Sequence, residues 1–185
     1  KLTDLLEASG ADPSKQAIYA YGLECLISTA IIISLLLIFG IIFQSFWTMV
    51  IFILFWIPLR MLVGGFHAKT HLTCTVLSVG IGTFAVIVTP YVSTILWFYS
   101  VTALILSYCA IFFLSRVLHK NHPLSEERVK KNRIKARIYG FIELAVIILL
   151  LALQSPAFAP AMLAYIITVI CAIVAKIQEV AARRS

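Results

Sequence analysis

Long apolar runs separated by short polar stretches make up most of this chain. Six of them cover about residues 23–43, 46–63, 72–92, 94–115, 138–154 and 157–176. The apolar residues are continuous rather than alternating, which predicts helices, and about 20 apolar residues are enough to cross the hydrocarbon core of a bilayer. Backbone groups in that core must satisfy their hydrogen bonds internally. The pattern therefore predicts an all-α integral membrane protein, built as a six-helix transmembrane bundle.

The first 20 residues have a different pattern. Leucines recur there at helical spacing beside acidic residues, and Asp12-Pro13 then supplies an N-cap and a first helical position. We expect residues 1–20 to form an amphipathic helix lying in the membrane interface. They lack the basic start and apolar centre of a cleavable signal peptide.

Composition supports the membrane interpretation. The chain has 185 residues, of which 62% are hydrophobic and 12% charged, against about half and about a quarter in soluble domains. Four cysteines lie at positions 25, 74, 109 and 171 without paired spacing, so they do not indicate a disulfide framework. The net charge of +7 could indicate nucleic acid binding, but in a membrane protein the positions of Lys and Arg report orientation first.

Basic residues are confined to one side of the predicted bundle. The turns at residues 44–45, 90–93 and 154–156 contain no Lys or Arg. The cations lie at Lys1, Lys15, Arg60, Lys69, residues 116–137, Lys176, Arg183 and Arg184. The positive-inside rule therefore predicts that both termini and residues 60–74 are cytoplasmic.

Residues 116–137 form the largest predicted cytoplasmic loop and hold eight of the fifteen basic residues. Ser125 with Glu126 to Arg128 can start a helix whose Lys and Arg residues cluster toward its end, where they suit the helix dipole. Clustered cations at this level attract anionic lipid or another acidic partner.

Reactive side chains gather in the polar island at residues 60–74. His67, His71 and Cys74 are spaced i, i+4 and i+7. Two imidazoles and a thiolate could bind zinc or copper, although a fourth ligand is missing. The histidines could instead be ordinary interfacial residues, and the cysteine could be a small residue that only packs in the core. A third interpretation is a cysteine nucleophile with a histidine base.

The third interpretation needs a bend in the chain. Seven residues of straight helix separate two Cα atoms by about 10.5 Å, beyond the combined reach of Cys and His side chains. Gly64-Gly65 can end a helix, and Thr70 or Thr73 can cap the next one. His67 would then lie in a loop and Cys74 in a first helical turn. Free N–H groups there favour a thiolate and could stabilise an oxyanion.

These residues carry a family resemblance. Arg60, Gly64-Gly65, His67-Ala68 and Cys74, spaced Arg-x3-Gly-Gly-x-His-Ala-x5-Cys, resemble the accessory gene regulator B (AgrB) family of membrane cysteine endopeptidases over essentially the whole chain. The resemblance implies a single transmembrane peptidase domain, residues 1–185, in the bacterial cell membrane. It would cleave an AgrD-like precursor peptide and help to close it into a thiolactone or lactone quorum-sensing signal.

The resemblance also assigns roles to residues. His67 and Cys74 take the catalytic positions, and Arg60 and Gly65 match positions important for activity. It implies an acyl-enzyme on Cys74, which a thiol of the precursor would resolve. Glu24 and Glu143 could reach Arg60 or orient His67, or could be ordinary interface charges. His71 could be a loop residue or a substitute base.

The expected partners follow from the same comparison. The precursor's acidic tail, or anionic lipid, would bind the cations at Arg128, Lys130, Lys131, Arg133, Lys135 and Arg137. We further expect a homodimer, no nucleic acid, no metal and no cofactor. The alternatives are a non-enzymatic membrane peptide exporter or scaffold and a His/Cys metal-binding membrane protein. Selective alkylation of Cys74 over the other cysteines would distinguish the enzyme from these alternatives.

Overall fold

The computed structural model of the chain describes residues 16–63, 71–92, 97–113 and 126–184. Its helices are α2 (Gln16–Ile42), α3 (Phe46–Val63), α4 (His71–Val92), α5 (Trp97–Phe113), α6 (Glu126–Ala152) and α7 (Phe158–Arg184). The described part of the chain contains no strand, so the all-α prediction is confirmed. The interfacial helix predicted for residues 1–20 lies mainly outside the described residues.

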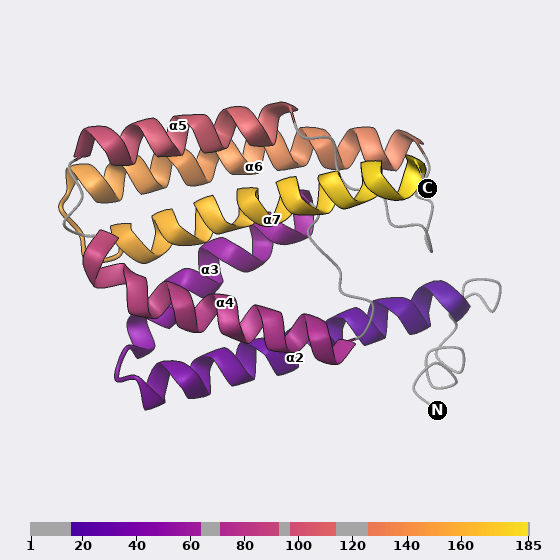
Figure 1. Cartoon of the computed structure of the whole chain (residues 1–185), viewed down its shortest axis with the longest axis horizontal. Coiled ribbons are helices and arrows are strands. Elements are labelled where there is room, and N and C mark those ends of the chain that lie inside the picture. Colours follow the sequence, from indigo (N-terminus) through magenta and orange to yellow (C-terminus); the bar gives the residue numbers. More distant parts are fainter. Residues whose placement is uncertain (1–15, 64–70, 93–96, 114–125, 185) are drawn as a thin grey trace.

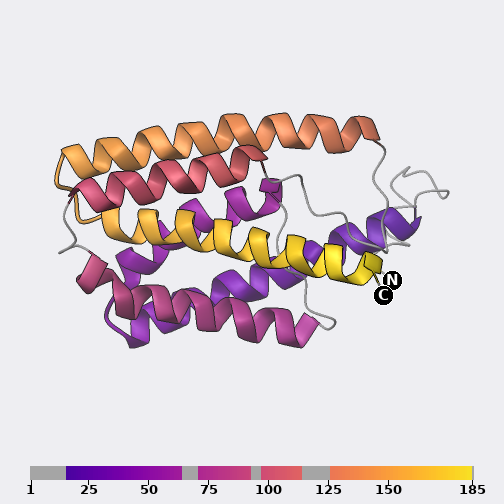
Figure 2. The ribbon, with the colours of Figure 1, turned by 45° about the horizontal axis from the view of Figure 1, so that its top comes forward.

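The six helices run up and down in one bundle (Figure 1). The starts of α2, α4 and α6 lie at the same end as the ends of α3, α5 and α7. We call this the cationic end, because it carries Arg60, residues 130–137 and Lys176. The turned view in Figure 2 shows the same arrangement, with α7 running across the middle of the bundle. Helices joined by short polar turns are thereby placed antiparallel.

Helix α3 lies at the centre and connects two apolar cores. It packs against α2, α4, α6 and α7, most extensively against α7. One core joins α3 to α5, α6 and α7 around the buried Leu59, Ile111 and Tyr165. The other joins α3 to α2 and α4 around the buried Leu36 and Trp56. Because α3 belongs to both cores, the position of its last turn is fixed from several sides.

Two of the turns at the opposite end share one design. Gln44 and Gln154 have φ values of 53° and 51°. After each of them a serine donates its backbone N–H to the carbonyl five residues earlier: Ser45 N to Gly40 O at 2.8 Å, and Ser155 N to Leu150 O at 2.9 Å. This pattern is a Schellman cap, which satisfies the last carbonyls of a helix. The turns predicted at 44–45 and 154–156 are therefore present.

The outer surface of the bundle suits lipid. Large apolar side chains such as Trp47, Leu54 and Phe113 are 74%, 61% and 81% exposed. Among the described residues, four segments are long and apolar enough to cross a bilayer: 22–42, 46–63, 72–92 and 158–181. Helix α5 has 17 residues, and the apolar part of α6 starts only after Arg137. The structure thus indicates a multi-pass membrane bundle, while the number of six spans stays a prediction.

Helix α6 differs from the prediction. The sequence predicted a helix in the basic loop, with its cations toward the helix end, and a membrane helix from about residue 138. Instead, one helix runs from Glu126 to Ala152. Residues 126–139 contain no Gly or Pro and are mostly strong helix formers, so nothing ends the helix. The cations therefore occupy its first half, and the expected match with a helix C-terminal dipole is wrong.

Close packing at the turn between α2 and α3 gives a first prediction. A methyl group at Gly40 would lie 2.8 Å from Cβ of the fully buried Met49, whereas one at Gly80 would meet nothing within 4 Å. Overpacking a tight site costs about 1–3 kcal/mol. We expect Gly40→Ala to lower the thermal unfolding midpoint in detergent, and Gly80→Ala, the matched control, to leave it unchanged or higher. Equal midpoints in the two variants would contradict this packing.

Candidate active site

The structure brings Arg60 and Cys74 together at the cationic end. Arg60 lies in the last turn of α3, and Cys74 is the fourth residue of α4. One guanidinium nitrogen of Arg60, Nη2, lies 3.7 Å from the Cys74 Sγ. The other, Nη1, donates a hydrogen bond of 3.0 Å to the Ser78 hydroxyl, one turn further along α4. The two terminal nitrogens of the Arg60 guanidinium thus contact two residues on the same face of α4.

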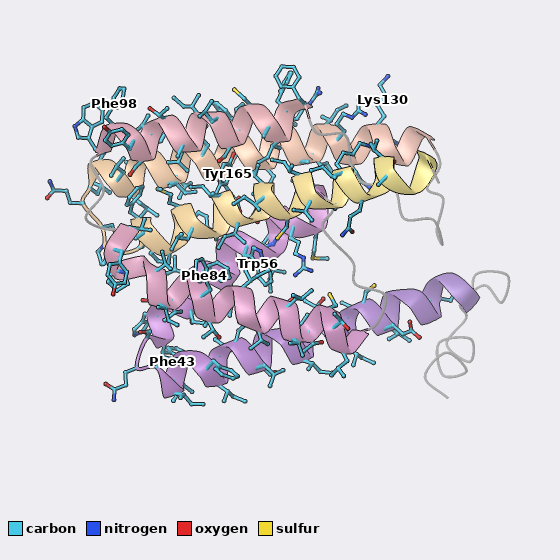
Figure 3. The ribbon with its side chains drawn as sticks, in the orientation of Figure 1. Phe43, Trp56, Phe84, Phe98, Lys130 and Tyr165 are labelled. Atoms are coloured by element: carbon cyan, nitrogen blue, oxygen red, sulfur yellow. The ribbon has the colours of Figure 1, made fainter. Side chains whose placement is uncertain are left out.

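The guanidinium of Arg60 packs over the ring of Trp56. This tryptophan lies one turn earlier on α3, is 1% exposed, and places its ring 4.8 Å from the guanidinium carbon. A cation over an indole face gains electrostatic attraction. Ser78 is also buried, at 1% exposed. Figure 3 shows Trp56 inside the bundle, between α3 and α4. The cation is therefore positioned before any substrate arrives.

This arrangement suits a reactive thiol. The thiolate is the nucleophilic form of cysteine, and a neighbouring arginine cation favours it. The first N–H groups of a helix have no partner within the helix and add partial positive charge at the same place. Cys171 of α7 also lies within electrostatic range of Arg60, and all four cysteines are free thiols. The start of α4 can thus stabilise negative charge on sulfur or on a nearby oxygen.

Several predicted site residues lie outside the described part. These are Gly64, Gly65 and His67, which fall between the end of α3 at Val63 and the start of α4 at His71. The described part of α4 begins at His71, and Cys74 is its fourth residue. The partnership between His67 and Cys74 stays a prediction.

The two candidate carboxylates lie in different surroundings, and the role expected for Glu24 stays a prediction. Glu24 is an exposed residue of α2. Glu143 is buried, at 4% exposed, and neither of its oxygens hydrogen-bonds to a described residue. The expected contact between Glu143 and Arg60 is therefore wrong in this structure. Glu143 lies level with Leu54 and Phe55 of α3, more than one turn from Arg60, because the packing of α6 on α3 sets its height.

The basic residues of α6 divide into two groups. Arg137 donates from Nε and Nη2 to the Phe112 carbonyl at 3.2 and 2.8 Å, and its guanidinium lies 4.0 Å from the ring centroid of the same residue. It therefore caps the end of α5. Lys130, Lys131 and Lys135 are exposed, and Figure 3 shows Lys130 pointing outward.

Two arginines near these lysines, Arg128 and Arg133, are less clear candidates for binding an acidic partner. Arg133 is partly buried, and its Nε lacks a hydrogen-bond partner among the described residues. Arg128 belongs to α6, but its side chain lies outside the described part. Binding of an acidic partner by this group stays a prediction, and the three exposed lysines are its best candidates.

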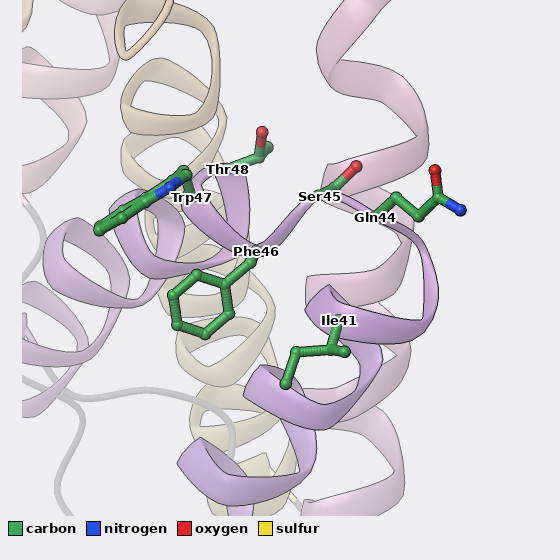
Figure 4. A pocket seen from close by; sticks show the side chains of 6 residues that line it. All are labelled: Ile41, Gln44, Ser45, Phe46, Trp47 and Thr48. Atoms are coloured by element: carbon green, nitrogen blue, oxygen red, sulfur yellow. The ribbon is translucent and has the colours of Figure 1, made fainter.

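A hollow of about 370 Å³ lies at the α2–α3 turn, lined by Ile41, Gln44, Ser45, Phe46, Trp47 and Thr48 (Figure 4). It carries no charged, histidine or cysteine side chain and lies at the end of the bundle opposite Cys74. Aromatic and polar residues of this kind are typical of the membrane–water interface. It is therefore a poor candidate for the chemistry.

Comparison with known proteins adds the family. The family described as accessory gene regulator B, AgrB, matches residues 1–177. The chain belongs to the AgrB family. This membership connects the protein with accessory gene regulator peptide processing and with an AgrD-type precursor peptide. No curated protein and no solved structure matches the chain.

The sequence pattern alone did not indicate Trp56 and Ser78 as site residues. The position of each residue relative to a predicted site residue could have indicated it. Trp56 precedes Arg60 by four residues, and Ser78 follows Cys74 by four, so each pair shares a helix face. Nothing in the sequence, however, shows that these two faces meet.

Proposed function

We propose that this AgrB-family protein is a membrane cysteine endopeptidase that cleaves an AgrD-type precursor and helps to close its core into a thiolactone or lactone. The observation that carries the proposal is the Arg60 guanidinium, 3.7 Å from the Cys74 sulfur at the start of α4. A thiol used only for packing does not need a partly buried, prepositioned cation beside it. Peptide export or scaffolding would give this contact no role.

The proposed reaction is acyl transfer. The Cys74 thiolate attacks the scissile carbonyl carbon, and the resulting oxyanion is stabilised by the helix N–H groups and Arg60. The C–N bond then breaks, and His67 gives a proton to the leaving amine, so that the tail departs and a thioester on Cys74 remains. A thiol or hydroxyl of the precursor attacks this thioester, transfers its proton to His67 and releases Cys74. A thiolactone forms with almost no loss of bond energy, because one thioester replaces another.

The acyl-enzyme is the intermediate that tests the proposal. Purified protein in lipid nanodiscs is mixed with an AgrD-type precursor whose ring-closing thiol or hydroxyl residue is replaced by alanine, so that only water can resolve the thioester. We expect mass spectrometry to find the N-terminal precursor fragment on the peptide containing Cys74, and hydroxylamine to remove it. A cleaved precursor without any adduct on Cys74 in rapid-quench samples would contradict covalent catalysis by this thiol.

His67 and His71 should differ in their effects. We expect His67→Ala to lower kcat by about 10²–10⁴-fold, the usual contribution of a general acid–base group. His71→Ala is the matched control and should retain a substantial part of the activity. Product formation by mass spectrometry measures both. EDTA should have no effect, and activity that is lost in EDTA and restored by zinc would support the metal-site alternative.

Charge reversal tests the exposed lysines of α6. Each cation near the membrane surface contributes about 1 kcal/mol toward an anionic partner, so we expect Lys130→Glu with Lys131→Glu to raise KM at least about tenfold. Lys176→Glu, at the same end of the bundle, is the control. A precursor whose tail acids are changed to lysine should partly restore processing by the double variant. If no compensating pair restores it while protein level and topology are normal, these lysines bind lipid rather than precursor.

A further inference from the structure

Glu143 is a buried carboxyl group that the proposed chemistry does not use. It lies in the apolar half of α6, is 4% exposed, and neither oxygen makes a hydrogen bond with a described residue. The Tyr139 hydroxyl, one turn earlier, interacts with this carboxyl group but does not reach hydrogen-bond geometry with either oxygen. A second nearby hydroxyl, that of Tyr165, is already used, since it donates to the Gly140 carbonyl at 3.0 Å. Buried polar groups are rarely left in this state without a reason.

Glu143 is one of six residues that line a pocket of about 170 Å³ between α3 and α6. Its lining consists of Leu54, Phe55, Tyr139, Ile142, Glu143 and Val146. Two of these residues, Leu54 and Ile142, are 61% and 51% exposed on the outer surface of the bundle. The pocket is therefore reached from the lipid-facing side. The polar residues of its lining are Tyr139 and Glu143 of α6, and the Glu143 oxygens are buried next to it.

The chemistry of the lining selects the occupant. Ca²⁺ takes six to eight oxygen ligands and Mg²⁺ near-octahedral geometry, but the described lining offers only one carboxyl group and one hydroxyl. Apolar walls next to a single carboxyl group suit a different ligand, an aliphatic chain that ends in a cationic group. Lysine and arginine side chains have this form, and they bury their methylene groups while the head keeps a polar partner. An intramembrane acid usually pairs with a cation.

We infer that this pocket binds a lysine or arginine side chain of the precursor peptide, with Glu143 as its counter-ion. The inference rests on the proposed function for the identity of the peptide. It gives the protein a substrate contact on the lipid-facing side of α3 and α6, away from the lysines at the start of α6. A peptide that approaches within the membrane surface could then be held at two places of opposite charge.

Chemical labelling tests the pocket without any cleavage assay. Dicyclohexylcarbodiimide, an apolar reagent for carboxyl groups, is applied to the full chain in nanodiscs, and modification of Glu143 is measured by peptide mass spectrometry. The probe is n-butylammonium, which reproduces the lysine stem and head, and n-butanol is its neutral control. We expect n-butylammonium to suppress labelling of Glu143 about tenfold more than n-butanol at the same concentration, the factor given by about 1.4 kcal/mol of binding. Equal suppression, or none, would overturn the site.

Two further controls belong to the labelling experiment. Labelling of Glu179, which pairs with Lys176 at 2.9 Å, should not respond to n-butylammonium more than to n-butanol. Tyr139→Phe should weaken the protection of Glu143, because the phenol oxygen contributes to holding the ammonium group. Unchanged protection in Tyr139→Phe would remove the phenol from the site, and protection of both acids alike would show a bulk effect and overturn the inference.

Kinetics connect the pocket with the precursor. We expect Glu143→Gln to raise KM for the precursor about tenfold, and to have no such effect on a precursor in which the bound lysine or arginine is replaced by methionine. Each basic residue of the precursor is replaced in turn to find it. If labelling is protected but no replacement removes the effect of Glu143→Gln, the pocket binds cations but not the precursor, and the inference fails. Failure of the proposed function itself would appear separately, as cleavage that does not need Cys74.

Discussion

Cys74→Ala should reduce cleavage of the precursor by at least about 10⁴-fold, the size of effect seen when an enzyme loses its nucleophile. The substitution removes one small, partly buried side chain at the start of α4 and adds no charge. Membrane insertion and the thermal unfolding midpoint should therefore stay close to the wild-type values. Cys74→Ser should also be strongly impaired, because a hydroxyl is a much weaker nucleophile than a thiolate in a site built for sulfur.

The measurement is the rate at which precursor fragments form, followed by mass spectrometry with protein in nanodiscs. Cys109→Ala is the matched control, since Cys109 is an exposed thiol on α5, and it should cleave the precursor at the wild-type rate. Cleavage by purified Cys74→Ala protein at the wild-type rate would show that Cys74 is not the nucleophile and would exclude the proposed cysteine endopeptidase mechanism.

Much of the fold was predictable because the hydrophobic pattern reports where helices meet polar turns. The break at Gln44-Ser45 is short, polar and free of charge, and α2 and α3 end and begin within one residue of the expected positions. Helix α6 was not predictable in this way. At Arg137 the sequence changes from basic to apolar, which marks a change in surroundings, but the backbone continues as helix because Lys, Arg, Glu and Ala all favour it.

The site was predictable only as far as local sequence determines it. Gly64-Gly65 and the threonines after it predicted a helix start just before Cys74, and Cys74 is the fourth residue of the described α4. The contact between Arg60 and Cys74 was not predictable, because it depends on how α3 and α4 are rotated about their axes when they pack. The same limit explains Glu143: its charge suggested a partner for Arg60, but the packing of α6 on α3 places it in a separate pocket.

Arg60 should contribute to activity through the contacts of its two terminal guanidinium nitrogens. Nη2 contacts the Cys74 sulfur and Nη1 binds the Ser78 hydroxyl at 3.0 Å, while the Trp56 ring supports the guanidinium. We expect Arg60→Gln to lower kcat/KM by about 10²-fold, the usual cost of removing one electrostatic contact from an active site. Arg60→Lys should fall between Gln and wild type, since one ammonium group cannot reproduce the planar fork.

Alkylation of Cys74 separates this role from a merely structural one. If the guanidinium stabilises the thiolate, the rate of modification by iodoacetamide at neutral pH should fall in the order wild type, Arg60→Lys, Arg60→Gln, in parallel with cleavage. Arg137→Gln is the matched control: it also removes an arginine at the cationic end, one that caps α5 at Phe112. That variant should lose thermal stability but keep the reactivity of Cys74. An Arg60→Gln protein that alkylates and cleaves at wild-type rates would show that the 3.7 Å contact has no part in activating the thiol.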